Sequence, residues 1–282
     1  MMQLGLIGYP LSQSLSPKLH EAALASLAIH GEYLLYPVAP EEIVRLAELV
    51  KHMRDREING LNVTIPYKQA IIPLLDELTS SAQAIGAVNT LYLNNDKLIG
   101  HNTDAPGFLA DQARFIRNSG IEKKALVLGA GGAARAVVYA LLKDGWKVSL
   151  AVRRADLNQA RTLIEAFDQP TGSNSMDFVL LEAGDLERLG SGIQLIVNAT
   201  PIGMFPEADF SPWPNGLPFP MEAAIYDLVY NPRQTRLVRE AQNAGLRATT
   251  GLGMLVEQAA LSFACWTGRD VPREVLYAAV EA

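Results

Sequence analysis

The sequence predicts an α/β protein with two domains. Segments with the pattern of buried strands alternate with segments of helical periodicity along most of the chain, which indicates parallel sheets covered by helices on both faces. A glycine-rich turn at residues 129–134 follows one such strand and opens a helix, as in dinucleotide-binding domains. At 282 residues the chain also exceeds the usual size of a single hydrophobic core. We therefore expect an N-terminal α/β domain and a second domain organised around the glycine-rich turn.

The N-terminal part of the chain alternates strands with helices and includes one hairpin. The expected strands are Gln3–Gly8, Tyr33–Val38 and Ile58–Thr64, and the expected hairpin pairs Thr90–Leu93 with Lys97–Ile99. The expected helices are Pro17–Ile29, Glu41–Met53, Lys68–Leu75, Thr79–Ile85 and Asp104–Asn118. The charged segment Glu122–Lys124 follows the last of these helices, and we expect it to act as a hinge.

A second series of strands and helices begins after this segment. The expected strands are Ala125–Leu128, Val148–Val152, Gln194–Asn198 and Ala224–Asp227. The expected helices are Ala133–Asp144, Leu157–Phe167, Thr235–Ala244 and Gly253–Trp266. The polar segment Gln169–Ser175 is expected to be a loop. Pro201–Pro220 contains six prolines, which interrupt regular structure, so we expect a long irregular connection there that could serve as a lid.

Composition and charge narrow the class of protein. Hydrophobic residues make up 49% of the chain and charged residues 19%, as in ordinary soluble globular proteins. The net charge of -6 disfavours nucleic acid as a partner, and no apolar run approaches the roughly 20 residues that span a bilayer. The N-terminus lacks the basic segment and cleavage pattern of a signal peptide. We therefore expect a cytoplasmic protein, a monomer or homodimer, with no nucleic-acid or membrane partner.

The single cysteine is expected to be structural. Cys265 on its own excludes an intrachain disulfide and a multi-cysteine metal site. It lies in the apolar stretch Ala259–Trp266, where a buried thiol is a more common outcome than a nucleophile.

The glycine-rich turn matches the G-x-G-x-x-A form of the dinucleotide fingerprint, with Gly129, Gly131 and Ala134 in the key positions. The first glycine permits a tight turn, and the second lets the backbone approach a pyrophosphate. The small third residue allows close packing between helix and strand. Because N–H groups at a helix start bind phosphate, the pattern predicts a Rossmann-type domain that binds a dinucleotide.

The end of the next strand indicates which dinucleotide. NAD-binding proteins usually carry an acidic residue there to bind the ribose 2′-hydroxyl. This chain has Val152, Arg153 and Arg154 instead, and two arginines suit a 2′-phosphate by charge and by stacking on adenine. We therefore expect NADP. Asp156 follows closely, so NAD stays an alternative.

Three serines precede the first expected helix. Ser16 stands directly before Pro17, as an N-cap residue does, and this structural role accounts for it fully. It does not account for Ser12 and Ser14. Hydroxyl groups beside a helix start suit a small anion such as a carboxylate, so these serines are equally well explained as an anion site.

The stretch "NVTIPYK", Asn62–Lys68, connects a buried strand to an expected helix. Pro66 suits the first helical position, whereas a lysine in the first turn of a helix is opposed by the helix dipole. Lys68 therefore requires another explanation. Taken alone, Lys68 would be a plain surface lysine, and its place at the carboxyl end of a strand leaves open whether it has a role in chemistry.

Two Asn-Thr pairs flank the expected hairpin. They are Asn89-Thr90 and Asn102-Thr103, and each offers small polar groups to a polyhydroxylated ligand, although such residues are also common turn formers. Asp104 follows the second pair. It is either the N-cap of the next helix or a functional carboxylate. His101 is expected to have a structural role or to lie at the rim of the site, and not to act in catalysis.

Together these segments resemble the shikimate dehydrogenase family. The matching stretches, in chain order, are "SQSLSPKLH", "NVTIPYK", "IGAVNT", "GHNTD", "GAGGAAR", "NATPIGM", "YDLVYNP" and "GLGMLVEQAA". The resemblance implies reversible, NADP-dependent reduction of 3-dehydroshikimate to shikimate in aromatic amino-acid biosynthesis. It also implies a substrate domain of residues 1–104 and 251–282, an NADP domain of residues 105–250, and a cleft between them.

The resemblance further implies roles for particular residues. Lys68 and Asp104 would be the catalytic acid–base pair. The implied substrate contacts are Ser14, Ser16, Thr64, Asn89, Tyr230 and Gln258, although Gln258 taken alone would be an ordinary helix residue. The implied cofactor contacts are Gly129, Ala130, Gly131, Gly132, Ala133, Arg153, Arg154, Thr200, Leu228, Gly251 and Met254. Because the nicotinamide supplies the redox chemistry, no metal is expected.

The chain departs from the family pattern in two places, and two other functions stay open. Val152-Arg153-Arg154 stands where members with firm NADP preference commonly have Asn-Arg-Thr, and Ala105 replaces a frequent glycine. One alternative is a dehydrogenase of the same fold that oxidises quinate as well as shikimate, with NAD. The other is a non-catalytic regulator that responds to NADP or shikimate. A regulator would need neither Lys68 nor Asp104, so their presence argues against it.

Overall fold

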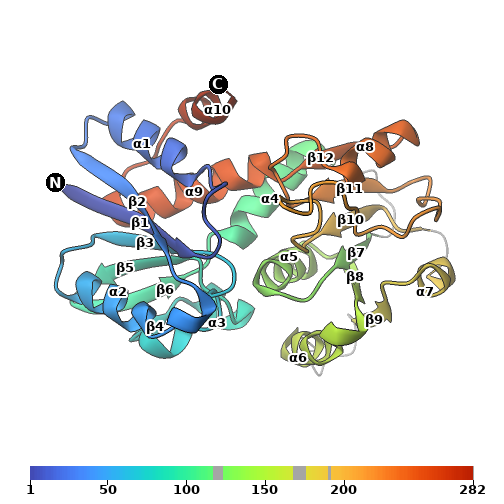
Figure 1. Cartoon of the computed structure of the whole chain (residues 1–282), viewed down its shortest axis with the longest axis horizontal. Coiled ribbons are helices and arrows are strands. Elements are labelled where there is room, and N and C mark those ends of the chain that lie inside the picture. Colours follow the sequence, from blue (N-terminus) through green and yellow to red (C-terminus); the bar gives the residue numbers. More distant parts are fainter. Residues whose placement is uncertain (117–122, 168–175, 190–191, 282) are drawn as a thin grey trace. The chain divides into compact units, whose positions relative to one another are not determined.

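The computed structural model describes residues 1–116, 123–167, 176–189 and 192–281. The chain divides into two compact units, each an α/β structure built on one sheet, which confirms the predicted fold class (Figure 1). The first unit comprises Met1–Gly107 and Leu255–Ala282, and the second comprises Phe108–Met254. The two boundaries fall within helices, α4 (Asp104–Phe115) and α9 (Leu252–Thr267).

The first unit has a mixed six-stranded sheet with the order β2-β1-β3-β5-β6-β4. Its strands are β1 (Met2–Gly8), β2 (Gly31–Pro37), β3 (Gly60–Val63), β4 (Glu77–Leu78), β5 (Thr90–Asn94) and β6 (Lys97–His101). β1 pairs in parallel with both β2 and β3, whereas β5 is antiparallel to β3 and forms the predicted hairpin with β6. The carboxyl ends of β1 and β3 therefore lie side by side at one edge, where their connecting loops meet.

Helices cover both faces of this sheet. They are α1 (Ser16–Ser26), α2 (Arg45–Arg54), α3 (Ser80–Ile85) and α10 (Arg273–Glu281), with the C-terminal part of α9. The buried positions of α2, Leu46, Leu49, Val50 and Met53, recur at helical spacing and belong to one hydrophobic core with Leu61. Figure 1 shows α1 and α10 on the opposite side of the sheet from α2. The sheet is therefore buried between two helical layers.

The second unit contains a parallel six-stranded sheet with the order β9-β8-β7-β10-β11-β12. Its strands are β7 (Lys124–Leu128), β8 (Lys147–Val152), β9 (Asp177–Leu180), β10 (Leu195–Asn198), β11 (Ala224–Asp227) and β12 (Ala248–Thr250). Its helices are α5 (Gly132–Lys143), α6 (Leu157–Phe167), α7 (Ala183–Arg188) and α8 (Arg236–Asn243). Counted in chain order the strands run 3-2-1-4-5-6, the order of a Rossmann fold, whose ligand crevice lies outside the carboxyl ends of the strands.

Most predicted elements are confirmed, and one helix is wrong. Residues 68–71 form turns, and only the short 3₁₀ helix Ile72–Leu74 follows, because Pro73 cannot supply the backbone donor of an α-helix. Two further 3₁₀ helices are Pro40–Glu42 and Arg154–Asp156. The sequence analysis missed β4, β9, β12, α7 and α10. Residues 201–220 form turns and bends, as predicted. The predictions for Asn118, Glu122 and residues 169–175 concern positions outside the described residues.

Candidate functional site

Lys68 and Asp104 form an ion pair in the first unit. The Nζ atom of Lys68 donates to Oδ2 of Asp104 at 2.7 Å. The side chains are 15% and 6% exposed, respectively, so the pair is largely shielded from water while the lysine keeps some access to solvent. Among the ion pairs given for the described residues, most are much more exposed, and exposed pairs contribute little to stability. This pair is a candidate for proton transfer.

Lys68 reaches this position from a turn, and not from a helix start. The backbone N–H of Tyr67 donates to the carbonyl of Thr64 at 2.9 Å, which closes the turn after β3. The Tyr67 side chain is buried, and its hydroxyl donates to the carbonyl of Val38. The carbonyl of Lys68 accepts from the N–H of Val88 at 2.7 Å. These contacts fix the backbone on both sides of the lysine, and the expected conflict with a helix dipole does not arise.

Asp104 is free to pair with Lys68 because Asn102 performs the capping. Oδ1 of Asn102 accepts from the backbone N–H groups of Asp104 and Ala105, at 3.1 and 3.2 Å, and its amide donates to the carbonyl of Ala87. Asp104 is the first residue of α4, so the interpretation of Asp104 as the N-cap is wrong. This capping role of Asn102 was not predicted from the sequence. The signal that could have identified it is the position of Asn102, two residues before the acidic residue that begins the helix.

Asn89 contacts the other oxygen of Asp104. Nδ2 of Asn89 donates to Oδ1 of Asp104 at 2.9 Å, and it lies 3.3 Å from Oε1 of Gln258 on α9. The structure thus brings Lys68, Asp104, Asn89 and Gln258 together, from a turn, a helix start, a strand start and a second helix. Carbonyl, carboxylate and ammonium groups in one place can bind hydroxyl groups and move a proton between oxygen and nitrogen.

The two serines predicted as substrate contacts, Ser14 and Ser16, lie at the start of α1. Ser14, and not Ser16, makes a hydrogen bond to the backbone there. The hydroxyl of Ser14 accepts from the backbone N–H of Ser16 at 3.2 Å, whereas Ser16 is buried as the first helical residue and makes no cap. The assignment of Ser16 as the N-cap is therefore wrong. Ser12 is exposed and Ser14 is half-buried. Because the hydroxyl of Ser14 only accepts in this bond, its own proton can still be donated to an anion.

Thr64 lies where the loops after β1 and β3 meet. The N–H of Tyr9 donates to the carbonyl of Ile65 at 3.0 Å, and that of Thr64 donates to Ile7 at 2.8 Å. A Cβ atom at Gly8 would collide with the methyl group of Thr64, so glycine is required for this close approach.

His101, which precedes Asp104 by three residues, is half-buried. Its Nδ1 contacts the Thr79 hydroxyl at 2.9 Å, in keeping with the expected structural role.

The glycine-rich turn of the second unit has the geometry that its pattern predicts. Gly129 has a φ of +103°, which favours glycine, and a side chain there would approach Thr200 to 3.0 Å. A Cβ at Gly131, the N-cap of α5, would meet no atom within 4 Å, so the backbone there is open to a ligand. The first turn of α5 carries no acidic residue, and Ala134 is fully buried. An anion is therefore favoured at this helix start.

Both arginines after β8 are exposed and both pair with acidic residues. Nε of Arg153 donates to Asp156 at 2.7 Å. Arg154 donates through Nε and Nη2 to the two carboxylate oxygens of Glu182, at 2.9 and 3.2 Å. These partners raise the pKa of both guanidinium groups, mainly through the hydrogen bonds. Asp156, which left NAD as an alternative cofactor in the prediction, binds Arg153. The second acidic neighbour, Glu182, was not predicted from the sequence.

Of the other predicted cofactor residues, Thr200, Leu228 and Gly251 follow the carboxyl ends of β10, β11 and β12, and Met254 lies in the first turn of α9. Thr200 donates twice to Oδ1 of Asn198, at 2.9 and 2.7 Å, and the N–H of Leu228 donates to the Asn198 carbonyl. Gly251 approaches Leu228 so closely that a Cβ atom would collide with the Leu228 carbonyl. Met254 is buried and Tyr230 half-buried, both in the second unit.

Buried Asp227 supports these loops. It accepts from Nδ2 of Asn198 at 2.7 Å, from the N–H of Val229 at 3.0 Å and from the hydroxyl of Thr235 at 2.6 Å. Burial raises the pKa of Asp227 to about 6, and its hydrogen bonds oppose that shift. The organising roles of Asn198 and Asp227 were not predicted from the sequence. Each is a polar residue that ends an apolar strand, and this shared pattern in β10 and β11 is the signal that could have identified them.

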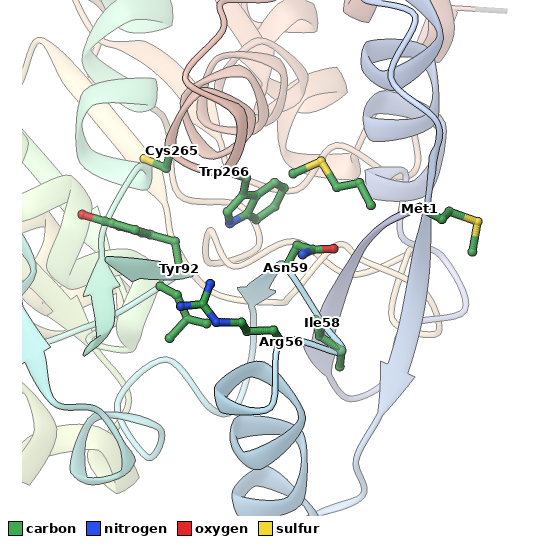
Figure 2. A pocket seen from close by; sticks show the side chains of 9 residues that line it. Met1, Arg56, Ile58, Asn59, Tyr92, Cys265 and Trp266 are labelled. Carbon is green, nitrogen blue, oxygen red and sulfur yellow. The ribbon is translucent and has the colours of Figure 1, made fainter. Parts of the chain in front are cut away.

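A surface pocket of the first unit contains none of the predicted site residues. Met1, Arg56, Tyr92, Cys265 and Trp266 line it, with others, between the start of β1 and the end of α9 (Figure 2). Cys265 is half-buried at this pocket, so the prediction of a buried thiol is wrong. Desolvation raises the pKa of the thiol, which makes it a poor nucleophile. The described residues contain no group of three His, Cys, Asp or Glu side chains that could hold a metal ion.

Comparison with family models matches two parts of the chain. Residues 6–91 match the shikimate dehydrogenase substrate binding domain, which includes Ser14, Thr64, Lys68 and Asn89. Residues 251–281 match the shikimate 5′-dehydrogenase C-terminal domain, which includes Gln258.

Comparisons over the whole chain agree with the family models. The chain is 40% identical to an NADP-dependent shikimate dehydrogenase of Methanopyrus kandleri over 98% of its own length and 93% of that protein. It is 39% identical to another from Salinibacter ruber over 98% and 96%. A crystal structure of the Thermus thermophilus enzyme with NADP(H) and shikimate superimposes with a TM-score of 0.82 at 39% identity, covering 100% of this chain and 99% of that one. This chain belongs to the shikimate dehydrogenase family.

Proposed function

We propose that Lys68 and Asp104 are the proton-transfer pair of an NADP-dependent shikimate dehydrogenase. The enzyme reversibly reduces 3-dehydroshikimate to shikimate, a step in aromatic amino-acid biosynthesis. The observation that carries the proposal is the shielded ion pair of 2.7 Å, with Asn89 donating to the second oxygen of Asp104. A regulator that only binds its ligand would not require this pair.

The second unit fits NADP. The open backbone at Gly131, the N–H groups at the start of α5 and the two exposed arginines after β8 match the pyrophosphate and the 2′-phosphate by charge and by shape. We propose that Gly129–Ala133 hold the pyrophosphate, that Arg153 and Arg154 bind the 2′-phosphate, and that Thr200, Leu228, Gly251 and Met254 line the rest of the site. When bound, NADPH supplies the hydride.

Lys68 and Asp104 stabilise the charge that develops on the substrate oxygen and transfer its proton. Reduction of a ketone builds negative charge on its oxygen, and the ammonium group of Lys68 stabilises that charge and donates the proton. In the oxidative direction the amine of Lys68 accepts the proton from the substrate hydroxyl. Asp104 orients Nζ of Lys68 and can accept a hydrogen bond from the reacting hydroxyl. Since the pair is largely buried, its electrostatic interactions are stronger than they would be in water.

Substrate binding is assigned to the first unit. Thr64, Asn89 and Gln258 offer hydroxyl and amide groups near or beside the ion pair, and Ser14 and Ser16 lie at the start of α1, where a carboxylate is favoured. We also propose Tyr230 as a substrate contact. This assignment makes the first unit the substrate domain and the second unit the NADP domain.

The proposal also covers the setting of the enzyme. No helix in the described ranges is both long and apolar enough to cross a membrane. We propose a cytoplasmic enzyme that acts as a monomer or homodimer on a small molecule, without a nucleic-acid partner.

One experiment separates this function from its alternatives. The purified protein is assayed for oxidation of shikimate and of quinate, each with NADP and with NAD. We expect turnover of shikimate with NADP at a kcat/KM at least ~10-fold above that with NAD, because the two arginines favour the 2′-phosphate, and a lower kcat/KM for quinate than for shikimate. Comparable rates with quinate and NAD would indicate the broader dehydrogenase. Binding of NADP and shikimate without turnover would indicate a regulator.

A further inference from the structure

A closed ring of hydrogen bonds lies directly behind Asn89. Nδ2 of Asn89 contacts the hydroxyl of Thr103 at 2.8 Å, which contacts that of Ser262 at 3.0 Å. The Ser262 hydroxyl contacts that of Thr90 at 2.8 Å, and Thr90 donates to Oδ1 of Asn89 at 3.0 Å. The three hydroxyl residues are fully buried and Asn89 is 2% exposed, so water does not compete for these bonds.

The direction of the ring follows from the groups that cannot change role. Nδ2 of Asn89 can only donate, so Thr103 accepts from it and its own proton goes to Ser262. Thr90 donates to Oδ1 of Asn89, because that oxygen can only accept. The single proton of Ser262 is shared between the hydroxyl of Thr90, at 2.8 Å, and the carbonyl of Gln258, at 3.0 Å. The backbone N–H of Thr103 also donates to Oδ1 of Asn89, at 2.8 Å, which agrees with this direction.

Asn62 holds Ser262 in place from the sheet. Its Nδ2 donates to the hydroxyl of Ser262 and to the carbonyl of Asn89, both at 3.0 Å, and its Oδ1 accepts from the hydroxyl of Tyr33 at 2.8 Å. Ser262 thus accepts from Asn62 and from Thr103. Ser262 is the ring member that α9 contributes. It lies one helical turn after Gln258, and its hydroxyl also donates to the Gln258 carbonyl at 3.0 Å.

We propose that Ser262 is a positioning residue for the reaction. Through the ring, Ser262 fixes the orientation of the Asn89 amide, so that an N–H points at Oδ1 of Asp104 and leaves Oδ2 to Lys68. Without Ser262, the hydroxyls of Thr90 and Thr103, which contact the Asn89 amide directly, lose the partner that links them, so the amide is held less firmly toward Asp104. Ser262 touches none of the reacting groups itself. This inference rests on the proposed role of Asp104.

The first test compares Ser262→Ala with Thr267→Val. Thr267 provides the matched control, because its hydroxyl contacts the carbonyl four residues earlier on the same helix, Phe263, as Ser262 does, and has no bond to the ring. We expect kcat of Ser262→Ala to fall about 10-fold, by misplacement of Asp104, with a smaller change in KM for shikimate. Thr267→Val should keep its kcat within about twofold of wild type. Equal kcat values in the two variants would overturn the proposal.

The second test measures whether Ser262 and Thr90 act through one ring. Thr90→Val removes the hydroxyl with little change of volume, whereas Thr90→Ser keeps it. We expect kcat of Thr90→Val to fall about as much as that of Ser262→Ala, and the double variant to lose little more than either single variant, because the ring breaks only once. Independent losses that multiply to about 100-fold would contradict the proposal. If Ser262→Ala does not fold, the comparison of Thr90→Val with Thr90→Ser tests the ring alone.

Failure of the proposed function has a different signature. It would appear as absence of shikimate turnover in the wild type, or as unchanged kcat in Lys68→Ala, and the inference would fall with it. Failure of the inference alone would leave an active wild type and an inactive Lys68→Ala, with Ser262→Ala no slower than Thr267→Val.

Discussion

Asp104 uses its two carboxylate oxygens for different partners. Oδ2 accepts from the ammonium of Lys68, and Oδ1 accepts from the amide of Asn89. The carboxylate therefore holds the lysine with one oxygen while a neutral donor fixes the other. A buried ion pair whose remaining oxygen lacked a donor would be less favourable, since burial penalises unpaired charge. Asn89 is thus part of the surroundings of the ion pair as well as a proposed substrate contact.

The two arginines after β8 provide a test of cofactor preference. Replacing both, Arg153→Ser with Arg154→Ser, removes the charges proposed to bind the 2′-phosphate. We expect KM for NADP to rise roughly 10- to 100-fold and KM for NAD to change little, because a charge-assisted hydrogen bond contributes about 1.5–3 kcal/mol. Steady-state kinetics with both cofactors measure the ratio.

The matched control for this test is Arg45→Ser. Arg45 forms an exposed pair with Glu42 at i,i+3 spacing, as Arg153 does with Asp156, but it lies in the first unit. It should leave both KM values unchanged. An unaltered NADP/NAD ratio in the double variant would mean that the 2′-phosphate binds elsewhere.

At the scale of elements, the start of α4 determines the position of Asp104, the proposed catalytic carboxylate. Asn102→Ala removes the acceptor for two N–H groups of the first turn, so we expect a loss of about 1 kcal/mol in the free energy of unfolding. We also expect kcat to fall several-fold, because Asp104 is the first residue of that turn. Both are measured on the purified variant, by denaturant unfolding and by initial rates.

Thr79→Ala tests whether loss of any helix cap in this unit would lower kcat as Asn102→Ala does. The hydroxyl of Thr79 caps α3 in the same unit by accepting from the N–H of Ala82. Its replacement should lower stability by a similar amount and leave kcat close to wild type. A kcat loss as large as that of Asn102→Ala would show that the effect comes from general destabilisation.

Periodicity and glycine chemistry were enough to predict most elements. The strands Gln3–Gly8 and Ala125–Leu128, and the turn with Gly129 and Gly131 between strand and helix, depend on local patterns, and the structure has them. The short strands β4 and β12 have only two and three residues, too few for a pattern. The expected helix at Lys68 failed because Pro73, five residues later, outweighs the favourable start at Pro66.

The pairing of Lys68 with Asp104, proposed here as catalytic, was predictable only through the family resemblance. Lys68 and Asp104 are separated by 36 residues, and no local pattern relates them. The partners that place them, such as Asn102 and Ser262, were missed because each looks like an ordinary polar residue in sequence. Their roles depend on hydrogen bonds between segments as distant as Asn62 and Ser262, 200 residues apart.

At the scale of the whole molecule, each unit gathers its polar groups at the carboxyl edge of its sheet. In the second unit this edge depends on Asp227, whose buried carboxyl has a pKa of about 6 against an ordinary value of 3.8. Between about pH 4 and 6 the folded protein therefore binds more protons at this group than the unfolded chain does. The contribution of Asp227 to the free energy of unfolding falls as pH rises through this range, by about 3 kcal/mol in total.

Asp227→Asn should remove that pH dependence. The variant keeps a similar shape but cannot titrate, so the difference in unfolding free energy between wild type and variant should shrink from pH 4 to pH 7. Denaturant unfolding of both proteins across that range measures it. A constant difference between them at every pH would show that the carboxyl of Asp227 titrates alike in the folded and unfolded chains.

The most direct test of the account is the effect of Lys68→Ala on kcat and KM for shikimate. The lysine acts on charge that develops in the transition state, so we expect kcat to fall roughly 10²- to 10⁴-fold while KM changes little. Lys51→Ala, which removes an exposed lysine paired with Asp55 in the same unit, should leave both values unchanged. A large rise in KM at unchanged kcat would instead make Lys68 a binding residue and contradict the proposed proton transfer.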